Sequence, residues 1–330
     1  MSLQISPLRD THLEDAATLV STRCRALRRH VVHLPPKYEE VGTLHPMLRE
    51  FTRKAPGVAA IHGGRLVGFL AGMVLPMFRG KRSVLSPEWA NGAELSESRR
   101  LYEEMYRELS ARWVANGCFT HVTVLLGADR DGLTAWQWLG FGLAAVDAVR
   151  GLDPVRAPDM DASLRRGTVD DIEDASALGE ALERHLASAP TYLAYDQRTR
   201  RQDYEDELRN RASALWLADD GGEAIASMGI GPASQEACTI IRDDKTASIV
   251  SAYTRVQARG RGIGTALLNQ SLEWARSEGY ERCAVDFEPM NSVAARFWMR
   301  HFEPICYALI RSVDERIAWA HQGRDRESFW

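Results

Sequence analysis

Apolar positions follow two different periods along residues 247–275. Residues 247–256 form a short run rich in small and β-branched apolar side chains, which predicts a strand. From Ile263 onward the apolar side chains recur about every 3.6 residues, which predicts a helix from roughly 262 to 277. Three glycines lie between these elements, within residues 257–264. The segment therefore predicts a strand, a glycine-rich turn and a helix.

A similar order of elements is predicted twice along the chain. The first half predicts a strand at 3–8, helices at 12–29 and 44–54, a hairpin of 58–61 with 66–71, a helix at 97–116, a strand at 121–126 and a helix at 133–139. The second half predicts a strand at 162–166, helices at 169–187 and 199–211, a hairpin of 214–218 with 224–230, the segment described above, a strand at 283–287 and a helix that Asn291 opens. Similar stretches such as Trp113–Gly117 and Trp274–Gly279 lie about 160 residues apart. We therefore expect two copies of one fold.

Residues 151–159 separate the two copies. They contain one glycine and two prolines and show no apolar period, which is typical of a linker. We expect the boundary near residue 155, so that the domains are 1–154 and 155–330. A length of 330 residues suits two domains of about 150 residues each.

Composition and charge narrow the class of protein. With 45% hydrophobic residues the chain can bury two cores, and its net charge of -4 argues against a general nucleic-acid binder. We expect no membrane partner, because the chain has neither an apolar run long enough to cross a bilayer nor a signal-peptide pattern at Met1–Pro7. The five cysteines are odd in number and form no C-x-x-C pair, which predicts a reducing cytoplasm and no metal site.

The glycine-rich turn is suited to bind a phosphate or pyrophosphate. Gly260, Gly262 and Gly264 carry no Cβ, so backbone N–H groups can point into one small concavity. The start of the following helix adds orphan N–H donors and the positive end of the helix dipole. Arg259 and Arg261 contribute positive charge and forked hydrogen-bond donors.

The spacing decides between phosphate ligands. A P-loop needs a Lys-Ser/Thr pair after its last glycine, where this chain has Thr265–Ala266. A dinucleotide fingerprint needs a glycine three residues after its second glycine, which is again Thr265. The pattern that fits is Gln257-x-x-Gly260-x-Gly262, which resembles the acetyl-CoA signature of the GNAT N-acetyltransferases in its Arg-Gly-Arg-Gly-Ile-Gly form. A nucleotide-binding fold that prefers NAD or ATP to CoA is kept as a weaker alternative.

The resemblance extends over residues 246–302, where a helix, a strand and an Asn-opened helix follow in the family's order. It implies an α/β (α+β) fold of two tandem GNAT-like domains, each with a mixed, mostly antiparallel twisted sheet flanked by helices. It also implies an acyltransferase that moves an acetyl group from acetyl-CoA directly to a primary amine, without a metal. The implied acceptor is a small molecule or a peptide, and a homodimer is left open.

The resemblance also implies which residues hold acetyl-CoA. In the family, backbone amides at the end of the strand hold the pantetheine arm, the glycine turn holds the pyrophosphate, and the helix-opening Asn contacts CoA. The residues expected at these places are Thr254, Arg255, Val256, Arg259, Gly260, Arg261, Gly262, Ile263, Gly264, Thr265 and Asn291.

A carboxylate base is expected beside the acceptor amine. A lysine-like amine with a pKa of about 10.4 is neutral in roughly one molecule in two thousand at pH 7, and only the neutral amine attacks. Glu288 follows the strand at 283–287 at the reacting end of the sheet, so we expect it to be the base, with Asp286 as the alternative.

A proton donor is expected beside the sulfur of the leaving CoA. The family often uses a Tyr on its last helix, but this chain has Phe297 and Trp298 there. Tyr253 is the expected substitute on chemical grounds, and Tyr307 is the alternative.

The first copy lacks the glycine-rich turn. Residues 86–94, the expected counterpart of 257–264, contain one glycine, no arginine and two carboxylates. Because negative charge disfavours a pyrophosphate, we expect a degenerate domain that binds no acetyl-CoA and helps to shape the acceptor pocket. A non-catalytic acyl-CoA-binding sensor or scaffold remains the alternative to an enzyme, since the family's Tyr is missing.

Overall fold

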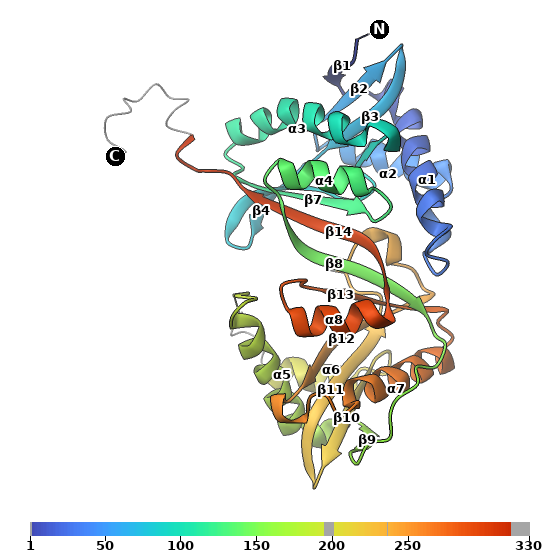
Figure 1. The fold of residues 1–330 in the computed structure, drawn as a ribbon, viewed down its shortest axis with the longest axis vertical. Coiled ribbons are helices and arrows are strands. Elements are labelled where there is room, and N and C mark those ends of the chain that lie inside the picture. Colours follow the sequence, from blue (N-terminus) through green and yellow to red (C-terminus); the bar gives the residue numbers. More distant parts are fainter. Residues whose placement is uncertain (1, 195–200, 236, 318–330) are drawn as a thin grey trace. The chain divides into compact units, whose positions relative to one another are not determined.

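The computed structural model describes residues 2–194, 201–235 and 237–317 as a mixed α/β fold (Figure 1). The chain forms two compact units. The first contains the described residues up to Val146, residues 238–240 and the segment that begins at Ile305. The second contains Asp147–Ala237 and Ile241–Pro304.

These units differ in two places from the expected domains 1–154 and 155–330. Strand β8 (Gly142–Gly151) passes from the first unit into the second, so the change falls inside a strand and not in the linker. Strand β14 (Glu303–Ser312) follows the last helix but pairs with β7 (Thr120–Leu126) of the first unit. Sequence periodicity shows that a strand exists but not which strand it pairs with, so nothing in the pattern indicated that β14 would pair with a strand of the first unit.

The first unit is built from four helices and two groups of hydrogen-bonded strands among its described residues. The antiparallel group has the order β1 (Gln4–Pro7), β2 (Gly57–His62), β3 (Arg65–Ala71) and β6 (Asn91–Ala93). The second group has the order β4 (Met73–Phe78), β5 (Lys81–Ser86), β7 and β14, in which β5 and β7 are parallel. The helices are α1 (Leu13–Arg28), α2 (Val41–Thr52), α3 (Ser98–Ala115) and α4 (Arg130–Trp138).

The second unit has one sheet whose order is β13-β12-β11-β10-β9. Its strands are β9 (Ser163–Arg166), β10 (Ala214–Asp220), β11 (Glu223–Pro232), β12 (Thr246–Thr254) and β13 (Arg282–Phe287), and only β12 and β13 run parallel. Its helices are α5 (Ile172–Ala187), α6 (Arg201–Arg209), α7 (Ile263–Ser277) and α8 (Ser292–His301). The two units therefore repeat the order strand, two helices, antiparallel strands, helix, strand, helix.

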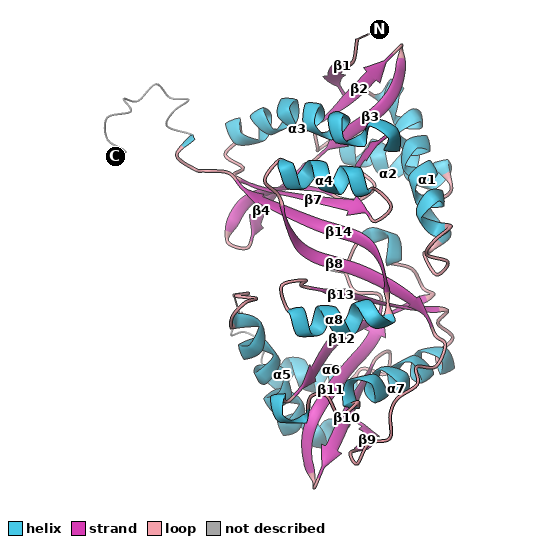
Figure 2. Cartoon of the chain, in the orientation of Figure 1, coloured by secondary structure: helices cyan, strands magenta, loops and turns pink. Residues whose placement is uncertain are grey.

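Helices cover both faces of the second sheet (Figure 2). On one face α5 and α6 pack against the strands through Leu178, Leu215 and Leu217, with Tyr253 of β12 at the edge of the cluster. On the other face α7 contacts β10, β11 and β12, and its Leu267 is fully buried. Because side chains alternate along a strand, those of β12 pack against α5 and α6 on one face of the sheet and against α7 on the other.

Most elements occur where the sequence predicts them, including both hairpins, but the hairpin of β4 and β5 was missed. Pro76 lies within β4, and a proline normally argues against a strand. It is tolerated here because β4 is the end strand of its group and needs no further ladder partner on one side.

The expected counterpart of the glycine turn, 86–94, was also misplaced. Residues 91–93 belong to β6, and α3 begins only at Ser98. The strand-to-helix turn of the first unit is therefore Glu94–Glu97, which has no glycine, no arginine and two carboxylates.

Across the described parts of the chain, every helix is too short or too polar to span a lipid bilayer.

Candidate functional site

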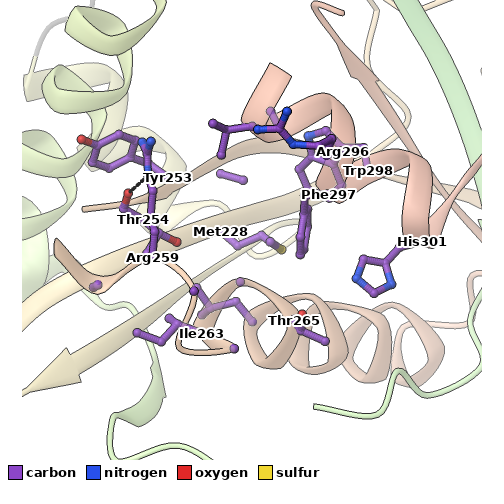
Figure 3. A pocket seen from close by; sticks show the side chains of 18 of the residues that line it. Met228, Tyr253, Thr254, Arg259, Ile263, Thr265, Arg296, Phe297, Trp298 and His301 are labelled. Carbon is purple, nitrogen blue, oxygen red and sulfur yellow. Dashed lines mark hydrogen bonds between the residues drawn. The ribbon is translucent and has the colours of Figure 1, made fainter. Parts of the chain in front are cut away.

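A cavity of about 640 Å³ lies in the second unit where β12 separates from β13 (Figure 3). The two strands pair only from Thr246 with Arg282 to Ile249 with Val285. Beyond Ile249, β12 continues alone beside β11, and Ala252, Tyr253 and Thr254 line the cavity. The divergence of two parallel strands therefore opens the space in which a ligand can lie against exposed backbone.

The glycine-rich turn forms one wall of this cavity. Gly260 and Gly262 have φ values of 80° and 82°, a left-handed conformation that side chains other than glycine rarely adopt. Gly262 is the N-cap of α7, and its carbonyl accepts from the amides of Thr265 and Ala266. The amides of residues 260–264 donate to no acceptor within the described residues. This cradle of free donors at a helix start fits a phosphate or pyrophosphate.

The charges around the cavity are of one sign. Four arginines line it, and no Asp or Glu stands among its described lining residues: the arginines are Arg156, Arg259, Arg296 and Arg300. Arg259 is fixed by a 3.0 Å hydrogen bond from its Nε to the carbonyl of Thr254, and its guanidinium lies 5.7 Å from the ring centre of Tyr253. A site this positive, on a chain of net charge -4, suits a ligand with several phosphates.

Most of the expected cofactor-binding residues line the cavity: Thr254, Arg259, Gly260, Gly262, Ile263, Gly264, Thr265 and Asn291. The other three have side chains directed elsewhere. Arg255 donates to the carbonyl of Ala224 and pairs with Glu223. Arg261 pairs with Asp220 at 2.8 Å, and the side chain of Val256 is 63% exposed. The short 3-10 turn Val256–Ala258 reverses the chain here, so neighbouring side chains cannot all face one space.

The two expected catalytic residues have different surroundings. Tyr253 lines the cavity, with its ring centre 6.3 Å from that of His185 on α5. Glu288 is half-buried and lies outside the lining set, and its backbone carbonyl accepts from the amide of Asn291. Asp286 is exposed, and Tyr307 belongs to the first unit. The role of Glu288 as a base stays a prediction.

Asn291 and the aromatic pair of α8 form the opposite wall. Asn291 is the N-cap of α8, and its Oδ1 accepts from the amide of Ala294 at 3.4 Å. The Phe297 ring lies 3.5 Å from the position that a Cβ on Gly264 would occupy, which is an ordinary van der Waals distance, so this ring packs closely on the start of α7. Trp298 also lines the cavity.

His301 was missed by sequence reasoning as a cavity residue. Figure 3 shows it at the end of the cavity away from Tyr253, and its ring centre is 4.9 Å from that of Phe297. Its Nε2 is buried and has no hydrogen-bond partner among the described residues. Burial, reinforced by the positive charges of Arg150 and Arg300, lowers its pKa, so the imidazole is neutral at neutral pH.

Other lining residues differ in whether the sequence could have revealed them. Arg296 and Arg300 are four residues apart on a predicted helix and so share one face, which was a usable signal. Arg156 and Pro158 belong to the linker, and no pattern connects them with the turn. In the structure a Cβ on Gly262 would meet Cγ of Pro158 at 2.2 Å, so the linker lies directly against the turn.

The matching place in the first unit is filled by side chains. Asn91 of β6 donates to the carbonyl of Val124 on β7 at 3.0 Å and so bridges β6 and β7. The corresponding strands of the second unit, β12 and β13, are separated at this place. The buried Arg23 of α1 donates to the carbonyl of Ala93 and pairs with Asp129 at 2.8 Å. A nearby hollow of about 490 Å³ is lined by carboxylates as well as arginines, since Glu94 pairs there with Arg65.

No group of three or more His, Cys, Asp or Glu side chains in the described ranges could hold a metal ion.

Comparisons with known proteins agree with this geometry. Residues 180–302 match the model of the Acetyltransferase (GNAT) family. Among curated proteins none matches this sequence. A GCN5-related N-acetyltransferase from Sphaerobacter thermophilus is similar in structure, with a TM-score of 0.56, 12% sequence identity, and coverage of 94% of this chain and 95% of that one.

Two further structures are similar at lower scores. One is a glucosamine N-acetyltransferase region of a fungal multi-domain GH3 beta-N-acetylglucosaminidase, with a TM-score of 0.49, 12% identity, and coverage of 94% of this chain and 38% of that one. The other is a tandem GNAT protein from the clavulanic acid biosynthesis pathway, with a TM-score of 0.42, 14% identity, and coverage of 94% and 98%.

Proposed function

Since residues 180–302 form a GNAT domain, whose fold supports acyl transfer, we propose that the protein moves an acetyl group from acetyl-CoA to a primary amine in its second unit. The observation that carries the proposal combines three features of the described residues: backbone donors at 260–264 without acceptors, four lining arginines, and no lining carboxylate. CoA carries a pyrophosphate and a further phosphate, which match a cradle of this sign and hydrogen-bonding capacity.

Each part of the cavity has a place in this proposal. The amides of residues 260–264 bind the pyrophosphate, and Arg259, Arg296 and Arg300 balance its charge. The pantetheine arm lies along the unpaired edge of β12 beyond Ile249, where backbone groups are free of β13. The thioester then reaches the end of the cavity that Tyr253 lines.

The reaction proceeds by direct attack. The nitrogen of the neutral amine bonds to the thioester carbon, the C–S bond breaks, and the phenol of Tyr253 donates a proton to the leaving sulfur. The nitrogen loses a proton to a base, for which Glu288 is the predicted group, and Tyr253 regains its proton from solvent. A covalent enzyme intermediate on a nearby thiol is disfavoured, because burial raises the pKa of Cys283 to about 12 and keeps it protonated. All five cysteines are buried free thiols, which supports placing the reaction in a reducing cytoplasm.

A pair of variants at Gly260 tests the donor site. A Cβ at this residue would meet nothing within 4 Å, and Asn and Asp both tolerate its left-handed backbone better than other side chains do. Gly260→Asn should weaken acetyl-CoA binding only a few-fold, because it adds no charge. Gly260→Asp should weaken binding about a hundredfold, because it places a carboxylate beside the pyrophosphate.

Calorimetric titration of acetyl-CoA into the two variants and the wild type measures this difference. Equal affinities for the Asn and Asp variants would show that no anionic group binds at the turn and would contradict the proposal. Binding of acetyl-CoA without turnover of any amine would leave the sensor function in its place.

A further inference from the structure

The carboxylate of Glu207, a residue of α6 that the proposed reaction does not use, lies between this helix and the sheet. Glu207 is on the side of this helix that faces the sheet, and its Oε1 is inaccessible to solvent. That oxygen has no hydrogen-bond or ion-pair partner within the described ranges of the chain. Glu205 on the same helix pairs with Arg209 at 2.6 Å, which is the usual arrangement for a helical surface glutamate.

The carboxylate of Glu207 occupies a gap that a glycine leaves open. A Cβ on Gly229 of β11 would lie 2.8 Å from Glu207 Oε1 and 2.7 Å from Ser251 Oγ. Real Cβ contacts are not this short, so the carboxylate and the hydroxyl gather at one point only because residue 229 is a glycine. Ser251 is paired with Gly229 on the neighbouring strand β12.

A β-bulge lies beside the gap. The register of β11 and β12 shifts between Gly229 and Ile230, which leaves Val250 as the extra residue of β12. The side chain of Val250 is 53% exposed, and its Cγ2 would be 3.2 Å from the same Cβ position. The bulge follows directly after Ile249, where β12 parts from β13. The gap therefore joins a hydroxyl, a carboxylate and an exposed aliphatic group.

The gap is adjacent to the reacting end of the cavity. Residues two apart on a strand lie on the same face, about 6.6 Å from each other. Ser251 and Tyr253 are therefore neighbours on one face of β12, and their partners Gly229 and Ser227 are neighbours on β11. Tyr253 and Ser227 line the cavity, so the gap lies one step beyond it.

An unpaired carboxylate in this position is unfavourable for the protein alone. Burial raises the pKa of Glu207, because desolvation penalises its charged form. An adjacent cation would reverse the penalty by pairing with the charge. A primary ammonium group has three N–H donors, enough for both the carboxylate and a hydroxyl, and its first methylene groups would contact Val250.

We propose that Glu207 and Ser251 form the acceptor subsite and that this subsite takes a primary alkylammonium group. The proposal rests on the proposed function for its position next to the thioester, and it narrows the acceptor class to amines that are cationic at neutral pH. Uncharged arylamines would gain nothing from the carboxylate.

Titration of n-butylammonium chloride into the full-length protein, with and without saturating CoA, tests the subsite. Glu207→Gln keeps the size of the side chain and removes its charge, so it should weaken binding about ten- to a hundredfold, the loss expected for a charged hydrogen bond. Glu205→Gln is the matched control, because it removes a carboxylate from the same helix, and should bind as the wild type does. 1-Butanol should not distinguish wild type from Glu207→Gln.

Two further readouts exclude a purely structural role. Glu207→Gln should leave the Tm unchanged or higher, since it removes a desolvated charge, and should leave the affinity for acetyl-CoA unchanged. Gly229→Ala should weaken ammonium binding although Glu207 is still present, because its Cβ fills the gap.

Three results would overturn the proposal. These are equal ammonium affinity in Glu207→Gln and wild type, no ammonium binding by the wild type, or a lower Tm in Glu207→Gln. Failure of the proposed function appears separately, as absence of acetyl-CoA binding.

Discussion

Both units contain the same order of elements, a strand, a turn and a helix. In the second unit these elements border an open cavity, whereas in the first unit side chains fill the matching place. In the second unit β12 parts from β13, and a cavity rich in arginine meets the amides of residues 260–264, which have no acceptor in the described part of the chain. In the first unit β6 is joined to β7 through Asn91, and the turn Glu94–Glu97 carries carboxylates. The comparison shows that a shared fold does not by itself provide a ligand site.

The difference lies in how polar groups near the strands are satisfied. In the first unit Arg23 pairs with Asp129 and donates to a nearby carbonyl, and Asn91 donates to the carbonyl of Val124. Ser98 also donates to Asp129, at 2.8 Å. In the second unit the amides at 260–264 and the Nε2 of His301 lack such partners among the described residues. The amides of the exposed Gly260 and Arg261 are available to a ligand, and the buried Nε2 of His301 is costly without a partner, so the second arrangement is the one suited to binding.

The largest expected effect is on the stability of the first unit. Arg23→Met removes one member of a fully buried ion pair and leaves the Asp129 carboxylate uncompensated, so the free energy of unfolding should fall by about 3–5 kcal/mol. Arg112→Met is the control, because Arg112 pairs with Glu108 on the exposed surface and should cost at most about 0.5 kcal/mol. Urea unfolding measures both. Similar losses in the two variants would show that the polar network does not stabilise the first unit.

The next effect concerns pH and a second buried histidine. His121 donates from Nε2 to the carbonyl of Cys118 at 3.0 Å and accepts from the hydroxyl of Tyr106 at Nδ1, at 2.7 Å. Desolvation by burial, with the charge of Arg311 adding to it, lowers its pKa from the ordinary value near 6.5 to about 4. Its neutral form is therefore required for folding, whereas the unfolded chain takes up a proton first as the pH falls.

Stability should therefore fall as the pH drops from 6.5 toward 4, by about 2–3 kcal/mol from this residue. His121→Gln cannot be protonated, so the difference in unfolding free energy between pH 7 and pH 4.5 should shrink by that amount in the variant. Urea unfolding at the two pH values checks this. An unchanged difference would mean that His121 does not couple the stability of the first unit to pH.

A smaller effect separates the tyrosines of the two units. The Tyr102 hydroxyl of the first unit is buried and donates to Asn91, whereas Tyr253 lines the cavity of the second. Tyr253→Phe should lower kcat about a hundredfold if its phenol protonates the sulfur, and should leave acetyl-CoA affinity nearly unchanged. Tyr192→Phe, at a highly exposed tyrosine of the same unit, should change neither. Loss of affinity at constant kcat would assign Tyr253 to holding Arg259 instead.

The sequence predicted the parts of this comparison that depend on local pattern. The glycine turn, Asn291 as a helix cap and both glycine hairpins follow from residue types whose backbone preferences are strong. What it could not predict depends on pairing between distant segments. Nothing local shows that β14 joins β7, that Pro158 lies on Gly262, or that Glu207 meets Ser251 across a missing Cβ.

The central claim is that the chain binds one acetyl-CoA, in its second unit. Calorimetric titration of acetyl-CoA into the wild-type chain tests it most directly, with Gly260→Asp as the companion. We predict one site per chain in the wild type and an affinity about a hundredfold weaker in the variant. Two sites would show that the first unit also binds the donor, and one site with unchanged affinity in Gly260→Asp would show that the turn does not bind it. Either result would contradict the account.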